Sequence, residues 1–281
     1  MGLHFLQQCG IIMISEIIHQ TTRGEYIHMG KIIAFANQKG GVGKTTSAVN
    51  IAASLGVLGY KVLLMDLDPQ GNATSGVGIV KKNLKVTSFD MLTTDTGVED
   101  VAIKTNFANL SVIPTNTTLA RAEYELADVE NGEYVIKNKL AGVSDQYDYI
   151  IIDCPPSLGM LTVNAMTASD GVVIPMQCEF FALEGLSQLM FTISRIKSHY
   201  NKELNVTGIL ITMYNNRLIL SAQVLSELRK HYEDKLFETT VSRNVKLSEA
   251  PSFGVPVYYH EKRSKGAIEY LNIAKELAER I

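Results

Sequence analysis

The chain has 281 residues, of which 46% are hydrophobic and 20% are charged. This balance is typical of a globular protein and excludes a disordered or fibrous one. A formal net charge of −3 excludes a chain that binds nucleic acid through overall charge alone. No apolar run approaches the roughly 18 residues that a membrane-spanning helix needs. The cysteines, Cys9, Cys154 and Cys178, lack metal-ligand spacing and fit a reducing cytosol.

Residues 1–28 fit the rest of the chain poorly. They contain apolar pieces but no basic stretch like the one that opens a secretory signal peptide, whereas 29–32 would make a natural start for a first strand. We therefore predict a disordered or dispensable extension at 1–28 and a single domain at 29–281. An amphipathic membrane anchor is the alternative, disfavoured because Arg23 is the only lysine or arginine in the extension.

The first strong signal in chain order is a glycine-rich stretch between a strand and a helix. An apolar run at 31–37 predicts a buried strand, and 47–58 carries apolar residues at helical spacing. Such a loop can curl its N–H groups around an anion, and the helix N-terminus adds positive partial charge. We predict that Lys44 reaches the β- and γ-phosphates of a nucleotide and that the Thr45 hydroxyl ligates Mg²⁺. The predicted phosphate-binding residues are Lys39, Gly40, Gly41, Val42, Gly43, Lys44, Thr45 and Thr46.

This loop departs from the common phosphate-loop pattern. Gln38 stands where that pattern has glycine, and a second lysine, Lys39, lies five residues before Lys44. A second cation beside a polyphosphate makes sense only if it also contacts phosphate or points into solvent. At this point the chain resembles the deviant Walker A ATPases of the ParA/MinD group. The resemblance implies that Lys39 reaches across a homodimer interface to the partner's nucleotide, so that ATP holds the dimer together.

Carboxylates follow two further predicted strands. Asp66 and Asp68 come directly after the apolar run 62–65, and Asp153 ends the run 149–153. Carboxyl ends of parallel strands are where ligands bind in open α/β sheets, and Asp153 is placed to hold a water of the Mg²⁺ shell. The family resemblance implies that Asp68 orients or activates the attacking water and that Asp66 lies near the metal. In the alternative interpretation, Asp66 accepts N–H groups and closes the turn.

The remaining elements alternate between strand and helix. Residues 73–109 show little pattern beyond a polar loop at 93–97 and a helical turn at 98–103. Alternation of this kind, with near-continuous apolar strands, predicts an α/β fold: a doubly wound, mostly parallel sheet with helices on both faces. The later predicted strands lie at 110–114, 171–176 and 206–213. The later predicted helices lie at 119–129, at 134–143, from the lead-in segment 179–185 to about 199, and at 266–281.

The last third of the chain carries the candidate surface chemistry. Residues 195–281 contain 14 Lys+Arg and 10 Asp+Glu, a net +4, while the rest contains 12 and 19, a net −7. The stretch 242–252 resembles the R-N-x-[RK]-L-S-E-A-P-S segment of chromosomal ParA proteins, also called Soj. That resemblance implies a basic surface with Arg217 and Arg243, to which Lys246 could add. Such a surface would bind double-stranded DNA without sequence preference, by phosphate neutralisation. Asn215 follows a strand end and is a candidate contact for the nucleotide base.

The resemblance runs from residue 30 to the C-terminus and implies the function. We expect a slow, Mg²⁺-dependent ATPase, with Lys39, Lys44 and Asp68 as catalytic residues, that partitions a chromosome or plasmid. We expect it in the cytoplasm, associated with the nucleoid, and stimulated by a ParB-type partner bound to a centromere-like site. Three alternatives stay open: an iron–sulfur electron carrier, a scaffold that binds ATP without turnover, and a MinD-like membrane-bound regulator of division-site placement. The last is disfavoured because acidic residues outnumber basic ones in the final helix.

Overall fold

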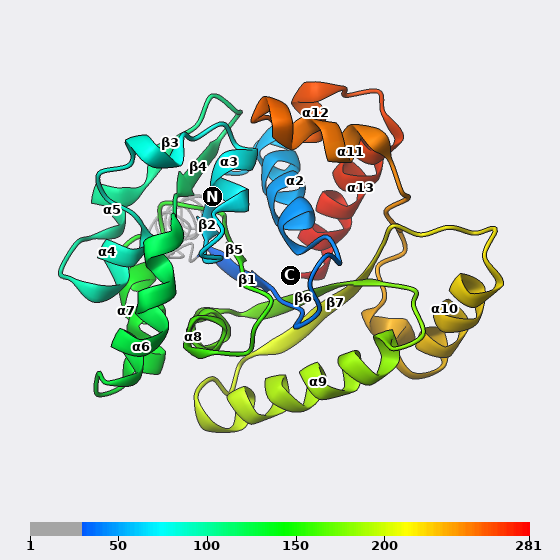
Figure 1. Ribbon diagram of the computed structural model, residues 1–281. Helices are drawn as coiled ribbons and strands as arrows, with labels where there is room; N and C mark the ends of the chain where they lie inside the picture. Colours follow the sequence, from blue (N-terminus) through cyan, green and yellow to red (C-terminus); the bar gives the residue numbers. More distant parts are fainter. Residues whose placement is uncertain (1–29) are drawn as a thin grey trace, which may run out of the picture.

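A computed structural model describes residues 30–281, and the prediction for 1–28 falls outside the described residues. Within the described part, a seven-stranded sheet has the order β3-β4-β2-β5-β1-β6-β7 (Figure 1). Neighbouring strands pair in parallel except β3 and β4, which are antiparallel. The strands are β1 (Lys31–Phe35), β2 (Val62–Asp66), β3 (Ile103–Lys104), β4 (Leu110–Ile113), β5 (Tyr149–Asp153), β6 (Gly171–Gln177) and β7 (Asn205–Thr212).

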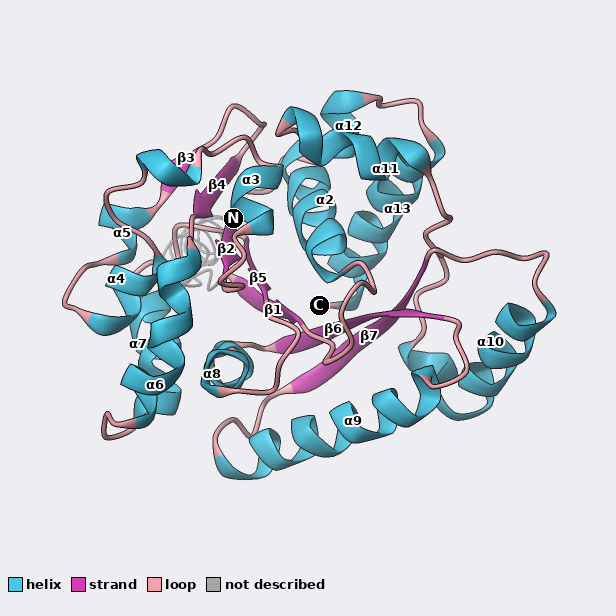
Figure 2. Cartoon of the chain, in the orientation of Figure 1, coloured by secondary structure: helices cyan, strands magenta, loops and turns pink. Residues whose placement is uncertain are grey.

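Helices cover both faces of this sheet (Figure 2). The helices α2, α3, α11, α12 and α13 pack into one hydrophobic core, and α4 to α10 pack into the core on the other face. Their bounds are α2 (Lys44–Val57), α3 (Asn72–Gly76), α4 (Ser88–Thr93), α5 (Val98–Val101), α6 (Ala122–Ala127), α7 (Val135–Ala141), α8 (Met160–Ala168), α9 (Ala182–His199), α10 (Ile219–Tyr232), α11 (Val245–Glu249), α12 (Val257–His260) and α13 (Lys265–Arg280).

The central strands are apolar throughout because both of their faces are covered. Side chains alternate between faces along a strand, and in β5 the side chains of Ile150 and Ile152 join one core while that of Ile151 joins the other. Near-continuous apolar strands are the mark of a parallel sheet between two helical layers. The prediction of a doubly wound, mostly parallel sheet is confirmed.

Some predicted elements differ from the observed ones. The helix predicted at 119–129 is shorter: a 3-10 turn (Thr117–Arg121) leads into α6, which ends at Ala127. Soon afterwards Asn131 takes a left-handed backbone conformation with φ 58°, which a continuing helix does not allow. In the poorly patterned stretch 73–109, α5 lies where the helical turn is predicted, while α3, α4 and the antiparallel edge strand β3 were not predicted.

The strand register brings the predicted site together. Asp153 at the end of β5 lies opposite Phe35 of β1 on one side and opposite Asp66 of β2 on the other. The chain therefore leaves β1, β2 and β5 at the same edge of the sheet. Strand order reverses around β1, since β2 and β5 lie on one side of it and β6 and β7 on the other. This is the switch point at which open α/β sheets bind ligands.

Candidate nucleotide-binding site

The loop between β1 and α2 is shaped by its glycines and held by the neighbouring strands. Gly41 and Gly43 have left-handed backbones, with φ 73° and φ 85°, which glycine adopts without strain. The Thr212 hydroxyl donates to the Val42 carbonyl at 2.7 Å, and Gln177 Nε2 donates to the Gly41 carbonyl at 2.8 Å. With carbonyls tied to the sheet, the loop is suited to offer its N–H groups to an anion.

Lys44 begins α2 and is 6% exposed. Its Nζ donates to the carbonyl of Lys39 at 3.1 Å, so the ammonium lies over its own loop. Burial lowers the pKa of Lys44, while the negative charges of Asp153 and Asp68 raise it. The buried cation therefore has acidic groups for neighbours and lies where a phosphate could contact it. Its reach to the β- and γ-phosphates stays a prediction.

Asp153 is fully buried, and neither of its carboxylate oxygens accepts a hydrogen bond from the described part of the chain. Burial raises its pKa well above the ordinary value, and the charge of Asp66 adds to the rise. The neighbouring Thr45 side chain lowers the pKa of Asp153 and so opposes this rise. Mg²⁺ in proteins is held by one or two carboxylates and keeps several waters. An unpartnered carboxylate beside a threonine hydroxyl fits that chemistry, so Thr45 and Asp153 are the residues that would hold Mg²⁺.

Asp66 is fully buried as well, but its oxygens have protein partners. Its Oδ1 accepts the Asp68 N–H at 3.2 Å, and its Oδ2 accepts both the N–H and the hydroxyl of Thr74 at 2.7 Å. Burial raises the pKa of Asp66 to about 6, against the lowering effect of these hydrogen bonds. The contacts favour the alternative interpretation, in which Asp66 closes the turn. Its role as a metal ligand stays a prediction.

Asp68 lies just beyond that turn and is 8% exposed. Its Oδ1 accepts the backbone N–H of Gln70 at 2.9 Å, and its own N–H is fixed by Asp66. Its charge acts on both Lys44 and Asp153. The backbone of Asp68 is thus held in place beside the predicted phosphate and metal positions. Its role in orienting water stays a prediction.

Lys39 points away from its own loop. Its Nζ forms an ion pair with the Glu179 carboxylate of the same chain, and the two side chains are 42% and 49% exposed. An exposed pair of this kind contributes about 0–1 kcal/mol. Lys39 is therefore available for another partner at little cost in free energy. Its reach to a partner's nucleotide stays a prediction.

Two cavities lie beside the loop. The smaller, of about 240 Å³, is lined by Gly43 and Thr46 and by the apolar side chains of Met213, Leu247 and Pro251. These walls suit a planar base next to the phosphate position. Sequence reasoning missed Met213, Leu247 and Pro251. The available signal was the L-S-E-A-P-S part of the C-terminal motif, which supplies the leucine and the proline.

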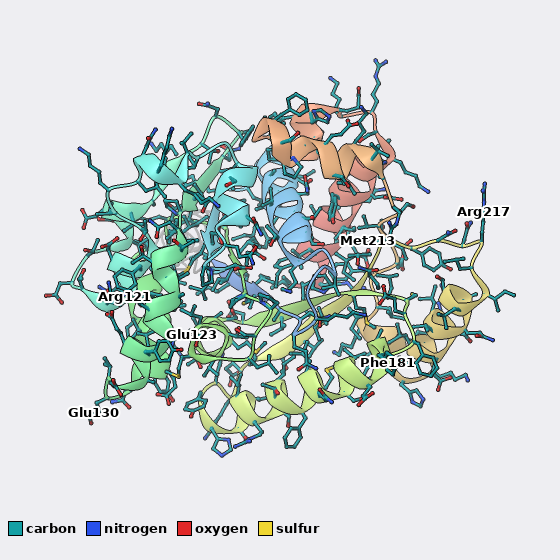
Figure 3. The ribbon with its side chains drawn as sticks, in the orientation of Figure 1. Arg121, Glu123, Glu130, Phe181, Met213 and Arg217 are labelled. Atoms are coloured by element: carbon teal, nitrogen blue, oxygen red, sulfur yellow. The ribbon has the colours of Figure 1, made fainter. Side chains whose placement is uncertain are left out.

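The larger cavity, of about 820 Å³, contains the residues predicted for the base and for DNA. Asn215, Arg217 and Arg243 all line it. Arg217 lies on a loop that projects from the body of the protein ahead of α10 (Figure 3). Lys246 is close to Arg243 in sequence but is paired with Glu249 at 2.8 Å. The structure thus brings the two arginines to one hollow, while the contact of Asn215 with a base stays a prediction.

The fold and the loop define the class: a P-loop nucleotide-binding protein. The family described as an AAA domain matches residues 30–206. The chain is 53% identical to the sporulation initiation inhibitor protein Soj of Bacillus subtilis over 89% of this chain and 99% of that protein. It is 46% identical to the chromosome partitioning protein ParA of Myxococcus xanthus over 92% of each. The chain belongs to the Soj/ParA family of chromosome-partitioning ATPases.

Solved structures of similar proteins hold nucleotides. Cobyrinic acid a,c-diamide synthase from Mycobacterium smegmatis, with bound ADP and magnesium, has a TM-score of 0.79 and 36% identity over 89% of this chain and 95% of that one. A plasmid partition protein from Borrelia burgdorferi, bound to AMPPNP, has a TM-score of 0.76 and 29% identity over 90% and 100%. The resemblance drawn from the two lysines and the carboxylate motifs is confirmed at the level of family and fold.

Two of the alternative functions depend on features that the structure describes. Between residues 30 and 281, no helix has the length and apolar character needed to cross a bilayer. Cys154 and Cys178 are both buried, as expected for small apolar residues, and burial raises the pKa of the Cys178 thiol to about 11.

Proposed function

We propose that this chain is an ATPase that dimerises on ATP and Mg²⁺ and binds DNA without sequence preference. With a ParB-type partner it would partition a chromosome or plasmid, in the cytoplasm at the nucleoid. The observation that carries the proposal is the buried carboxylate of Asp153, which has no hydrogen-bond partner among residues 30–281 and lies beside Lys44 and Thr45. Family membership supports the partitioning role.

The proposed chemistry uses positioning and charge rather than a covalent intermediate. The loop N–H groups and Lys44 hold the phosphates, while Thr45 and Asp153 hold Mg²⁺, which supplies neutralisation of the phosphate charge when bound. Asp68, whose backbone is fixed by Asp66, orients a water for attack on the γ-phosphate. Such positioning in a water-poor site is a sufficient source of rate for phosphoryl transfer.

The proposed switch uses the second lysine. Lys39 would leave Glu179 of its own chain and contact the nucleotide of the partner subunit, so that two nucleotides and two loops close the dimer. Hydrolysis removes the γ-phosphate, so Lys39 loses the negative charge that would hold it at the nucleotide of the partner subunit. Dimerisation doubles the number of exposed arginines on one assembly, which raises DNA affinity through released counterions and makes it depend steeply on salt.

Arg243→Glu tests the DNA-binding part. We expect this variant to dimerise with ATP but to lose DNA binding, measured by fluorescence anisotropy with duplex DNA at increasing salt. The plot of log affinity against log salt has a slope of about 0.9 per phosphate contact, so a partial loss would appear as a shallower slope. Arg121→Glu is the matched control, because it makes the same charge change at an exposed arginine that lies on the other side of the molecule from Arg217 (Figure 3). Binding retained by Arg243→Glu at moderate salt would refute the basic surface.

A MinD-like membrane role is disfavoured by the last helix. Ile273, Ala274 and Leu277 of the apolar stripe of α13 are buried in the core that α13 shares with α2, whereas Ile268 is 50% exposed. This agrees with the interpretation of the stripe as core packing and leaves those side chains unavailable to lipid. Co-sedimentation with liposomes and with DNA, each with ATP, separates the two functions. Binding to liposomes but not to DNA would overturn the proposal in favour of the membrane role.

A further inference from the structure

Two carboxylates of α13 hold the backbone that leads to Arg243. Glu276 accepts the N–H of Glu238 at 2.7 Å and the N–H of Thr239 at 3.3 Å. Two turns earlier on the same helix, Glu269 accepts the N–H of Ser242 at 3.0 Å and its hydroxyl at 2.8 Å. Because positions seven apart lie on one face of a helix, the two carboxylates clamp residues 238–242 along the side of α13.

The clamped segment connects both predicted DNA-binding arginines. Arg243 directly follows Ser242, and its Nη2 lies 3.9 Å from the sulfur of Met213. The backbone N–H of Tyr214 donates to the carbonyl of Val241 at 2.9 Å, which joins the segment to the loop that carries Arg217. Fixing 238–242 on α13 therefore fixes the base of both arginine-bearing loops.

Glu269 is negatively charged and lies close to Arg243, where charge alone would oppose DNA binding. A carboxylate close to a DNA-binding cation repels phosphate and would weaken binding if charge were its only effect. Yet Glu269 is only 9% exposed. Carboxylates are rarely buried unless they are paired, and the cation that pairs with Glu269, Lys265, lies 3.7 Å away. Its two hydrogen bonds to Ser242 are charge-assisted, which makes them stronger than neutral ones.

We propose that Glu269 is a positioning residue for DNA binding: it holds Ser242 so that Arg243 is presented to the phosphate backbone in a fixed geometry. This inference rests on the proposed DNA-binding function and deepens it. Glu276 anchors the other end of the same segment. The benefit of a pre-ordered loop exceeds the repulsion of the carboxylate, because an ordered arginine loses less conformational freedom when it binds.

Substitutions at Glu269 separate the effect of geometry from that of charge, because losing the hydrogen bonds should weaken DNA binding whereas losing the negative charge should strengthen it. Glu269→Ala removes both, and we expect the dissociation constant for duplex DNA to rise about tenfold, although a negative charge has been removed. Glu269→Gln keeps the shape and one of the two accepting oxygens while removing the charge, and we expect its DNA affinity to fall between those of the wild type and Glu269→Ala. Glu238→Gln is the control for charge alone, because its side chain is exposed and lies on the same segment.

A double-mutant cycle then distinguishes positioning from a general structural effect. If Glu269 acts through Arg243, Glu269→Ala has no further effect in an Arg243→Ala background. Thermal unfolding and ATP-dependent sizing check that each variant folds and dimerises. Should Glu269→Ala fail to fold, Ser242→Ala provides the same test from the other partner, with an expected loss of about threefold.

The outcomes are separable from those for the proposed function. DNA affinity that is unchanged or increased in Glu269→Ala, or in Ser242→Ala where that variant is used, overturns the positioning role while DNA binding itself stands. Equal losses with and without Arg243 overturn it also, because the effect would not pass through Arg243. A wild-type chain that binds no DNA with ATP overturns the proposed function instead.

Discussion

Asp153→Asn should stabilise the nucleotide-free protein while weakening its response to Mg²⁺ and ATP. Burial raises the pKa of Asp153 well above its ordinary value, so at neutral pH the folded state must either hold a buried charge or bind a proton, at a cost on the order of 3–5 kcal/mol. The described residues give neither oxygen of Asp153 a hydrogen bond. An uncharged asparagine amide buried in the same place, with its polar groups unpaired, costs about 1–3 kcal/mol. The difference of about 2 kcal/mol corresponds to a rise of roughly 4–8 °C in the unfolding midpoint for a chain of this size.

The assay is thermal unfolding with EDTA, and again with Mg²⁺ and ATP. At about 100 times its dissociation constant the nucleotide adds about 2.7 kcal/mol to the wild type, and we expect a smaller addition to Asp153→Asn. Glu130→Gln is the control, since Glu130 lies at an exposed tip of the molecule (Figure 3); its midpoint should move by less than the equivalent of about 0.5 kcal/mol. The reasoning would be refuted if Asp153→Asn had the same unfolding midpoint as the wild type in EDTA, or if Mg²⁺ and ATP raised the midpoints of both proteins equally.

Other predictions concern Asp66, Lys39 and Asp68. Burial raises the pKa of Asp66 from 3.8 to about 6, so the folded state binds its proton more tightly than the unfolded state does. That stabilisation is complete below about pH 4 and is lost as pH rises through about 6, a change of roughly 3 kcal/mol; unfolding midpoints that do not fall over this range would contradict it. Lys39→Ala should bind ATP but stay monomeric by light scattering, and a normal ATP-dependent dimer would exclude the cross-subunit role. Asp68→Ala should accumulate the ATP-bound dimer because hydrolysis stops, whereas unchanged phosphate release would remove Asp68 from the mechanism.

The sequence predicted the site better than it predicted the site's internal contacts. A strand, a glycine loop and a helix are adjacent in the chain, so local pattern is enough to place Lys44 and Thr45 at the sheet edge. The sequence also placed Asp66 and Asp153 there, but it could not separate their environments. What distinguishes them is the partner each meets: Thr74 donates to Asp66, and no described residue donates to Asp153. Such partners depend on packing between distant segments.

The elements that sequence reasoning missed have weak periodicity for physical reasons. Helix α8 buries residues on nearly every side, so it shows no polar face and no amphipathic repeat. Helix α10 opens with Ile219, which is 78% exposed, so an apolar residue stands where the pattern needs a polar one. Strand β3 has two residues, which is too short for any alternation to be detected. In contrast, α13 was predicted well because most of its apolar residues fall on one buried side, although Glu269 is buried and Ile268 is exposed.

The contacts of Lys39 and Asp153 suggest an order for the proposed events, because breaking or keeping each contact has a different cost in free energy. The pair between Lys39 and Glu179 is half exposed, so breaking it requires no more than about 1 kcal/mol and it cannot by itself keep the chain monomeric. Asp153 is the costly group, and in our proposal a ligand that brings Mg²⁺ relieves this cost. Loading within one chain therefore comes first in our proposal. Lys39 changes partner afterwards, because only then does a triphosphate stand in the opposite subunit with enough charge to attract it away from Glu179.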